Sequence, residues 1–449
     1  MGQKLSRSVK LIYGAGDLGF SLTSTIIGAY FLFFLVDVVS IKPAVAGIAI
    51  LIGRTWDYIN DPIIGHISDR TRSRWGRRRP FLLFGALPFA LAFMLMWYRP
   101  PFDSQVALAA YYAIAYVIFD AAATFVYMPY FALTPELTDD YDERTSLTSY
   151  RMFFSIFGSL LAFTVPLMIV GTFSPENAAR VLLMAVLFGL VSALPLLLVF
   201  FNTKEKNIYA LQDKPKLLPS LKAAFKNRPF VFGAVIYLLT WICMDILQTI
   251  LLFFIKYVLG LEAMSDLIMA LIFVTAILAL PLWEYASRRF NKRLAYAYGV
   301  AFWAVVQMLL ITIGPSVALP VLILLCVMAG IGVSAAHVLP WSILPDAVEW
   351  DEYSTGERHE GMFYSLITLM HKIASSVAIP LTAVMLDLTN YAPNAAQQPA
   401  SAVLGIRLLV GPIPAVLLTL GILFALKYPL DRRQFSDMVG ELQKRRGNL

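Results

Sequence analysis

Two aspartates, Asp57 and Asp61, lie four residues apart within a long, mostly apolar stretch. In an α-helix this spacing places both carboxylates on one face, one turn apart. Two unpaired carboxylates in apolar surroundings would cost several kcal/mol, so something positive must meet them. Their oxygen atoms, with the adjacent Asn60, suit a hard cation such as Na⁺. A shared proton would also lower the cost, because each negative charge raises the pKa of its neighbour.

A purely structural role for these carboxylates is the alternative hypothesis. Arg54 lies one turn before Asp57, and Lys372 lies in a distant apolar stretch. A lysine in such surroundings needs a carboxylate partner or loses its proton. Asp57 and Asp61 would then pair with Arg54 and Lys372 and lock helices together. Both interpretations remain open from the residues alone.

Further ionisable residues occur in apolar stretches, where they are rare and usually face a cavity or a partner. They are Asp17, Asp120, Arg151, Asp245, Glu284, His337, His371 and Arg407. We interpret the two histidines as hydrogen-bonded packing residues, and Asp245 either as a cavity residue or as a structural one. Among the aromatic residues, those beside polar positions are candidate substrate contacts: Tyr127, Phe131 and Trp341.

The composition explains why charges are so conspicuous in this chain. Of its 449 residues, 59% are hydrophobic and only 14% are charged, whereas average globular chains are roughly 25% charged. This excludes a soluble protein and indicates an all-α membrane protein. The net charge of +7 comes from basic clusters between apolar stretches and indicates no nucleic-acid partner. Both cysteines lie in apolar stretches, so neither a disulfide framework nor a metal cluster is expected.

Twelve stretches meet the length of about 20 apolar residues that a membrane-spanning helix needs. They are residues 11–36, 44–68, 81–98, 105–133, 146–171, 179–201, 229–257, 264–287, 294–313, 317–342, 361–386 and 402–428. We therefore expect four parts in the chain. They are an N-terminal six-helix half (1–201), a cytoplasmic linker (202–228), a C-terminal six-helix half (229–428) and a cytoplasmic tail (429–449).

Basic residues cluster at the N-terminus, after the second and eighth spans, in the linker and in the C-terminal tail. The positive-inside rule then places both termini and the linker on the cytoplasmic side of the cytoplasmic membrane. The arginine-rich loop at residues 69–80 is interpreted as an orientation signal and an inter-helix lock, rather than as a patch for anionic lipid.

The two halves share short motifs in the same order. Residues 62–70 resemble residues 281–289, residues 129–136 resemble residues 340–346, and Glu-Arg pairs follow at 143–144 and 357–358. A parallel repeat of six helices is typical of major-facilitator transporters, in which the substrate binds between halves near the membrane midplane. No Walker, GxGxxG, HExxH or CxxC motif is present, so we expect neither an enzyme nor an ATP-driven pump, and no cofactor.

The residues 54–65 and 69–77 resemble the signature of the glycoside–pentoside–hexuronide:cation symporters, whose best-known member is the melibiose permease. The resemblance extends over nearly the whole chain and implies the major facilitator fold. By motif register it implies a cation site formed by Asp57, Asn60, Asp61 and Thr124, with the metal ion Na⁺ at Asp57 and Asp61. It also matches Arg151 and Lys372 to functional positions of the family.

The sugar site departs from the family pattern. The resemblance places Ser21, Tyr127 and Phe131 where the galactoside-binding members carry two aspartates and a tryptophan, while Asp17 and Asp120 lie nearby. The expected substrate-binding residues are therefore Asp17, Ser21, Asp120, Tyr127, Phe131, Arg151, Trp341 and Lys372. Residues 340–346 also resemble the sodium-dependent lysolipid symporters, which share this fold.

These observations predict a monomeric symporter that works by alternating access. The coupling ion is Na⁺ or H⁺, and the substrate is a small molecule, namely a sugar, glycoside or uronide. The alternative with the same fold is a sodium-dependent symporter of lysophospholipids or other amphiphiles. A non-transporting receptor or scaffold is a third hypothesis, against which the paired carboxylates argue.

Overall fold

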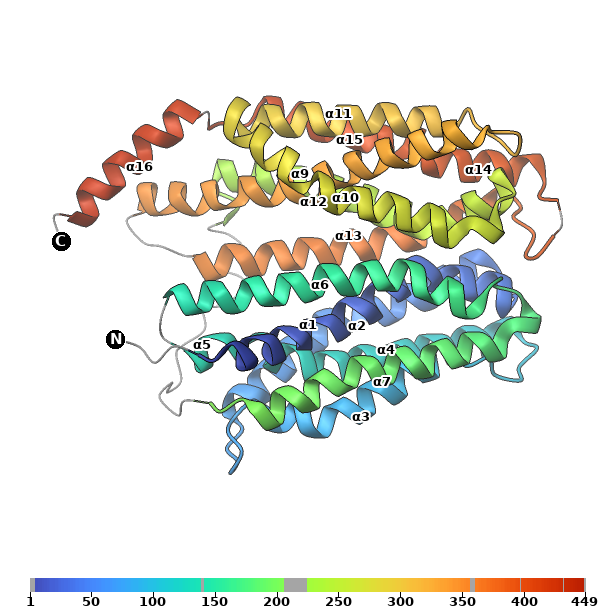
Figure 1. The fold of residues 1–449 in the computed structure, drawn as a ribbon, viewed down its shortest axis with the longest axis horizontal. Helices are drawn as coiled ribbons and strands as arrows, with labels where there is room; N and C mark the ends of the chain where they lie inside the picture. The colour runs from blue at the N-terminus through green and yellow to red at the C-terminus, as the bar shows by residue number, and fades with distance from the viewer. Residues whose placement is uncertain are drawn as a thin grey trace. The chain divides into compact units, whose positions relative to one another are not determined.

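The computed structural model describes residues 5–138, 141–205, 224–355, 360–395, 397–430 and 432–447, and these form helices joined by short connections (Figure 1). The first elements are α1 (Arg7–Ile26), η1 (Ile27–Phe31), η2 (Phe34–Val38), α2 (Pro43–Arg70), α3 (Arg79–Met96), α4 (Gln105–Phe131), α5 (Thr134–Leu137), α6 (Tyr141–Val170), η3 (Pro175–Asn177) and α7 (Ala178–Asn202). They are followed by α9 (Arg228–Phe253), η4 (Phe254–Leu259), η5 (Glu262–Met264), α10 (Ser265–Phe290), α11 (Lys292–Leu310), α12 (Leu319–Thr355), α13 (Glu360–Leu388), α14 (Ala400–Val410), α15 (Pro412–Leu426) and α16 (Arg432–Gly447).

Ten helical stretches of the described residues are long and apolar enough to cross a membrane. They correspond to the last ten of the twelve predicted spans. The first two predicted spans, 11–36 and 44–68, are also helical but are not among the ten. Polar residues account for this in α2, whose central turns carry Arg54, Asp57 and Asp61. The chain is an integral membrane protein with many helical spans.

Contacts divide the chain into two compact units. Unit 1 comprises Met1–Gln212, Glu262–Leu267 and Ile379–Ala402, and unit 2 comprises Asp213–Leu261, Ile268–Ala378 and Val403–Leu449. Helix α7 ends at Asn202 and α9 begins at Arg228, at the two ends of the predicted linker. Residues 206–223 of that linker lie outside the described residues, and the predicted division into halves, linker and tail stays a prediction.

Unit 1 is held together by close approaches between helices. Helix α1 packs against α6 and α7, and α4 packs against α2 and α3. A Cβ at Gly16 would collide with the ring of Tyr130 on α4, so only glycine allows α1 to lie this close. Small residues at helix contacts are typical of membrane proteins, in which packing rather than the hydrophobic effect holds helices together.

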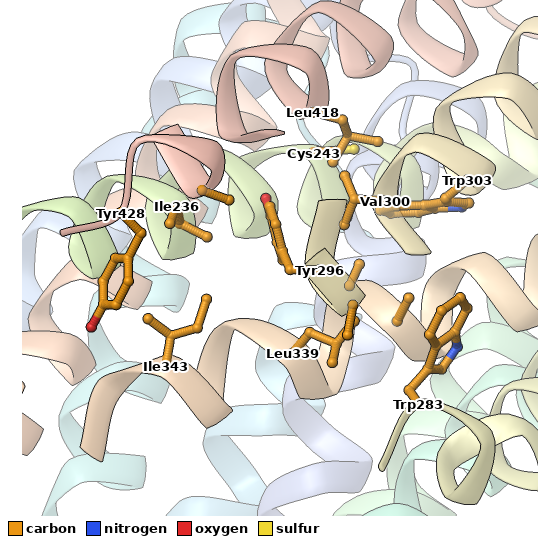
Figure 2. Packing of buried hydrophobic residues seen from close by; sticks show 14 of the residues in the cluster. Ile236, Cys243, Trp283, Tyr296, Val300, Trp303, Leu339, Ile343, Leu418 and Tyr428 are labelled. Atoms are coloured by element: carbon orange, nitrogen blue, oxygen red, sulfur yellow. The ribbon is translucent and has the colours of Figure 1, made fainter. Parts of the chain in front are cut away.

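Unit 2 has its own core between α9, α11, α12 and α15. Buried side chains from these helices interlock around Tyr296 (Figure 2). The Tyr296 hydroxyl lies 2.7 Å from the Thr240 hydroxyl on α9. Trp303 and Leu339 pack in the same cluster. The Tyr296–Thr240 hydrogen bond satisfies polar atoms that would otherwise be costly in an apolar core.

A wholly buried carboxylate in unit 1 connects distant parts of the sequence. Asp37, at the end of η2, accepts a 2.7 Å hydrogen bond from the Tyr391 hydroxyl. The side-chain amide of Asn394 donates to the backbone carbonyl of Asp37. In the same segment, the side-chain oxygen of Gln398 accepts a hydrogen bond from the Ala392 N–H at 3.0 Å. We call the contact of Asp37 with Tyr391 and Asn394 the Asp37 tether.

The Asp37 tether predicts a measurable loss of stability in Tyr391→Phe. Removing the hydroxyl takes a donor from a buried carboxylate, which costs about 1–3 kcal/mol and lowers the melting temperature by roughly 2 °C or more. The measurement is thermal unfolding of the purified protein in detergent. Tyr285→Phe, at a residue that is 65% exposed, is the matched control and should melt like the wild type. Equal melting temperatures for the two variants would contradict a stabilising tether.

Candidate functional site

Three of the four predicted cation-site residues are adjacent in unit 1. The Thr124 hydroxyl of α4 donates to a carboxylate oxygen of Asp61 on α2 at 3.3 Å. One residue earlier on α2, the Asn60 amide donates to the backbone carbonyl of Asp120 at 3.3 Å. Asp57 precedes Asp61 by one turn of the same helix. Carboxylate, amide and hydroxyl oxygens therefore gather at one level of α2 and α4.

The burial of this group matches a role within the membrane. Asn60 and Thr124 are buried, whereas Asp57 and Asp61 are half-buried. Pro62 follows directly and cannot donate the helical hydrogen bond to the carbonyl of residue 58. The sequence thus loosens α2 beside Asp61, and both carboxylates keep some exposed surface through which an ion can reach them.

The central turns of α2 and α4 carry charged side chains of both signs. Tyr116 on α4 has Arg54, Asp57 and Asp120 as electrostatic neighbours. Asp57, Asp61 and Asp120 contribute carboxylates to these turns, and Arg54 contributes a guanidinium. Among the described residues, no group of three or more His, Cys, Asp or Glu side chains could hold a metal ion.

A second polar cluster joins α1, α4 and α6. The Arg151 guanidinium donates to Asp17 at 3.0 Å, and the carboxylate of Asp17 is almost completely buried. The same guanidinium lies over the Phe131 ring, 4.6 Å from its centre. Arg151 therefore contacts both Asp17 and Phe131, and all three are predicted substrate residues. The charge of Asp17 is neutralised by a partner within unit 1.

The other predicted substrate residues of unit 1 lie along the same helices. The Ser21 hydroxyl is 2.7 Å from the Ser155 hydroxyl of α6. Tyr127 is buried beside Phe20 and Phe131, and its hydroxyl has no hydrogen-bond partner among the described residues. This part of unit 1 is mainly aromatic.

Trp341 and Lys372 belong to unit 2. Trp341 on α12 is 38% exposed and packs edge-on against Tyr237 of α9, with ring centres 5.2 Å apart. Lys372 on α13 is half-buried. Since Asp57 and Asp61 lie in the other unit, a pairing with Lys372 stays a prediction.

The arginine-rich loop between α2 and α3 forms contacts that the sequence only partly indicated. The side chains of Arg77 and Arg78 both reach one carboxylate oxygen of Glu136 at 2.5 Å. These ion pairs form the predicted inter-helix lock. Sequence reasoning missed Glu205, which accepts the backbone N–H groups of Arg77, Arg78 and Arg79 at 2.6, 2.9 and 2.7 Å.

The Glu205 contact depends on backbone shape. Gly76 has φ of +106°, and a Cβ there would meet the Glu205 carboxyl carbon at 2.6 Å. Burial raises the pKa of Glu205, whereas the three N–H donors lower it. The three N–H groups therefore stabilise the ionised form of Glu205, which desolvation disfavours. They lie at the N-terminus of α3, where the helix dipole also favours a negative charge.

Comparison with known proteins identifies the family of this chain. Residues 12–432 match the family described as MFS/sugar transport protein. The chain belongs to this family. It is 34% identical to an uncharacterised symporter of Synechocystis over 99% of this chain and 98% of the relative. It is 28% identical to the sodium-dependent lysophosphatidylcholine symporter 1-A of Danio rerio over 95% of this chain and 87% of that one.

Solved structures show the same fold. A D-xylose–proton symporter superposes with a TM-score of 0.67 at 17% identity, covering 94% of this chain and 97% of the other. Family and fold together confirm the predicted membership in the major facilitator superfamily, close to the glycoside–pentoside–hexuronide symporters. The family is one of transporters, as the sequence predicted, and not of enzymes.

The Glu205 contact predicts that Glu205→Ala destabilises the protein. The variant loses an acceptor for three N–H groups at the start of α3, which costs about 1–3 kcal/mol. The measurement is thermal unfolding in detergent. Lys204→Ala changes the preceding, exposed residue and should have no effect. Unchanged melting of Glu205→Ala would show that the loop does not need this carboxylate.

Proposed function

We propose that this protein is a cation-coupled symporter that works by alternating access, with Na⁺ as the preferred coupling ion. The observation that carries the proposal is the α2–α4 cluster, in which the Thr124 hydroxyl donates to the Asp61 carboxylate at 3.3 Å and Asp57 precedes Asp61 by one turn of α2. The sodium dependence of the Danio rerio relative supports Na⁺ over H⁺. Proton coupling at the same aspartates is the alternative.

In this proposal Asp57 and Asp61 supply carboxylate oxygens, and Asn60 and Thr124 supply an amide and a hydroxyl oxygen. Without the ion, two negative charges one turn apart repel each other. Binding of the ion removes this repulsion and favours the conformation that takes up substrate. Because the coupling between two bound ligands is reciprocal, the substrate must tighten ion binding by the same factor.

We further propose that the protein acts as a monomer in the cytoplasmic membrane, with both termini on the cytoplasmic side. The distribution of basic residues supports this orientation, because the N-terminus, the loop of residues 69–80 and the C-terminal tail are all basic. The Glu136 and Glu205 contacts would then lie at the cytoplasmic end of the bundle.

The α2–α4 cluster predicts how the aspartates respond to sodium. Wild-type protein in detergent should melt at a higher temperature in NaCl than in KCl, because an ion that binds only the folded state stabilises it. Asp61→Asn and Asp57→Asn should lose most of this sodium-dependent shift. Asp103→Asn, in an exposed loop, is the matched control and should keep it. A full sodium shift in both cluster variants would contradict the assignment, and a shift with pH alone would indicate proton coupling.

For the substrate, we propose a single-chain amphiphile of the lysophospholipid class. The identity and coverage shared with the lysophosphatidylcholine symporter support it. The aromatic wall of Phe20, Tyr127 and Phe131 and the Asp17–Arg151 ion pair also support it, since neither offers an available carboxylate to sugar hydroxyls. A sugar, glycoside or uronide is the second candidate, favoured by the description of the family as sugar transporters.

A panel of ligands separates these two substrate classes. In NaCl, lysophosphatidylcholine below its micelle concentration should stabilise the wild type, whereas melibiose and a methyl glucuronide should not. Asp61→Asn serves as the control for detergent-like effects, because such effects do not depend on sodium coupling. Stabilisation by a sugar or uronide alone would reverse the order of the two candidates.

A further inference from the structure

One face of unit 2 carries an unusual group of nitrogen-bearing rings. It is formed by α9, α12 and α13 and contains Trp241, His337, Trp341 and His371, which we call the indole–imidazole face. Trp241, His337 and His371 each lie in the middle turns of their helices. In transporters of this fold, substrates bind near the membrane midplane.

The rings of this face are in direct contact. The imidazole of His371 stands edge-on to the Trp241 indole, with ring centres 4.4 Å apart and planes at 84°. His337 contacts the same indole at 5.3 Å. Tyr237 connects the group to Trp341 at 5.2 Å and places its hydroxyl 3.5 Å from Nδ1 of His371. Three helices thus contribute to one continuous surface.

This surface does not suit contact with lipid chains. His337 and Trp341 are both exposed, Trp341 by 38%. Polar and ionisable side chains within spans face a bundle interior or a water-filled path, because hydrocarbon cannot satisfy them. Asp245 lies one turn after Trp241 on the same face of α9. The exposure of His337 and Trp341 is therefore exposure to a solvent or substrate path.

The hydrogen-bonding groups of this face are mainly donors. The buried indole N–H of Trp241 has no acceptor among the described residues, and an indole can only donate. Each neutral imidazole carries one N–H donor and one acceptor nitrogen, whereas the indole of Trp341, like that of Trp241, only donates. Asp245 is the nearby carboxylate, and it already accepts the Ser375 hydroxyl at 2.5 Å. A ligand that satisfies this face must bring acceptors.

We propose that the indole–imidazole face binds a phosphate group of the transported molecule. The Trp241 N–H and an N–H of His337 donate to phosphate oxygens, while the exposed Trp341 ring packs against the adjoining part of the substrate. This inference rests on the proposed transport function and narrows its substrate class. Lysophospholipids and sugar phosphates both carry the group, and a neutral glycoside or an uncharged lipid does not.

The test uses the full-length protein in detergent with NaCl and two variants that remove one donor each. Trp241→Phe keeps an aromatic ring without the N–H, and His337→Gln replaces the imidazole. The probes are lysophosphatidylcholine, a monoacylglycerol of the same chain length, glucose 6-phosphate and a methyl glucuronide. Binding is measured as a dissociation constant from ligand-dependent thermal shifts.

The expected result is binding of one phosphate-bearing probe to the wild type, weakened about tenfold in each variant, since one charge-assisted hydrogen bond is worth roughly that factor. The matched control is Trp97→Phe, which removes another buried indole N–H that has no partner among the described residues but lies in unit 1. It should bind the probe like the wild type. Which phosphate-bearing probe binds identifies the source of the phosphate.

Three outcomes would overturn the inference. They are wild-type affinity in both Trp241→Phe and His337→Gln, equal binding of monoacylglycerol or glucuronide, and no binding of either phosphate-bearing probe. The sodium-dependent shift without substrate is measured in every sample. Loss of that shift in the wild type would count against the proposed symport, whereas an intact shift in the variants shows that they fold and confines a negative result to this face.

Discussion

Charged side chains cannot remain in the hydrocarbon interior of a bilayer without partners, and this constraint organises both units. In unit 1 the Arg151–Asp17 ion pair joins α6 to α1, and the Thr124–Asp61 hydrogen bond joins α4 to α2. In unit 2 the Ser375–Asp245 hydrogen bond joins α13 to α9. Each contact satisfies a costly group and also fixes two helices at mid-span, so the cost of desolvation determines where the helices meet.

The polar groups that a ligand could contact differ in kind between the two units. On α2 and α4 they are the carboxylates of Asp57 and Asp61 with the Asn60 amide and the Thr124 hydroxyl. On the indole–imidazole face of unit 2 the surplus is in donors. A cation and an acceptor-rich substrate thus suit different surfaces of the same chain, as separate binding of ion and substrate requires.

Much of this organisation could be predicted from sequence, because composition and spacing are local properties. The spacing of Asp57 and Asp61 placed them on one face, and apolar length located the spans, with α2 less apolar than expected because of its own charges. Contacts between residues far apart in the chain leave no pattern in the local sequence. Asp37 and Tyr391 are 354 positions apart, and Glu205 gives no local sign that it accepts three N–H groups. The sequence predicted His337 and His371 to be separate packing residues, whereas in the structure both imidazoles contact the Trp241 indole.

The Asp37 tether has a consequence for biosynthesis. Unit 1 includes Ile379–Ala402, a segment that the ribosome makes after most of unit 2. The carboxylate of Asp37 therefore cannot accept the Tyr391 hydrogen bond until most of the chain has been synthesised. Unit 1 cannot reach its final structure as a nascent N-terminal fragment, and its completion is tied to the insertion of α13 into the membrane.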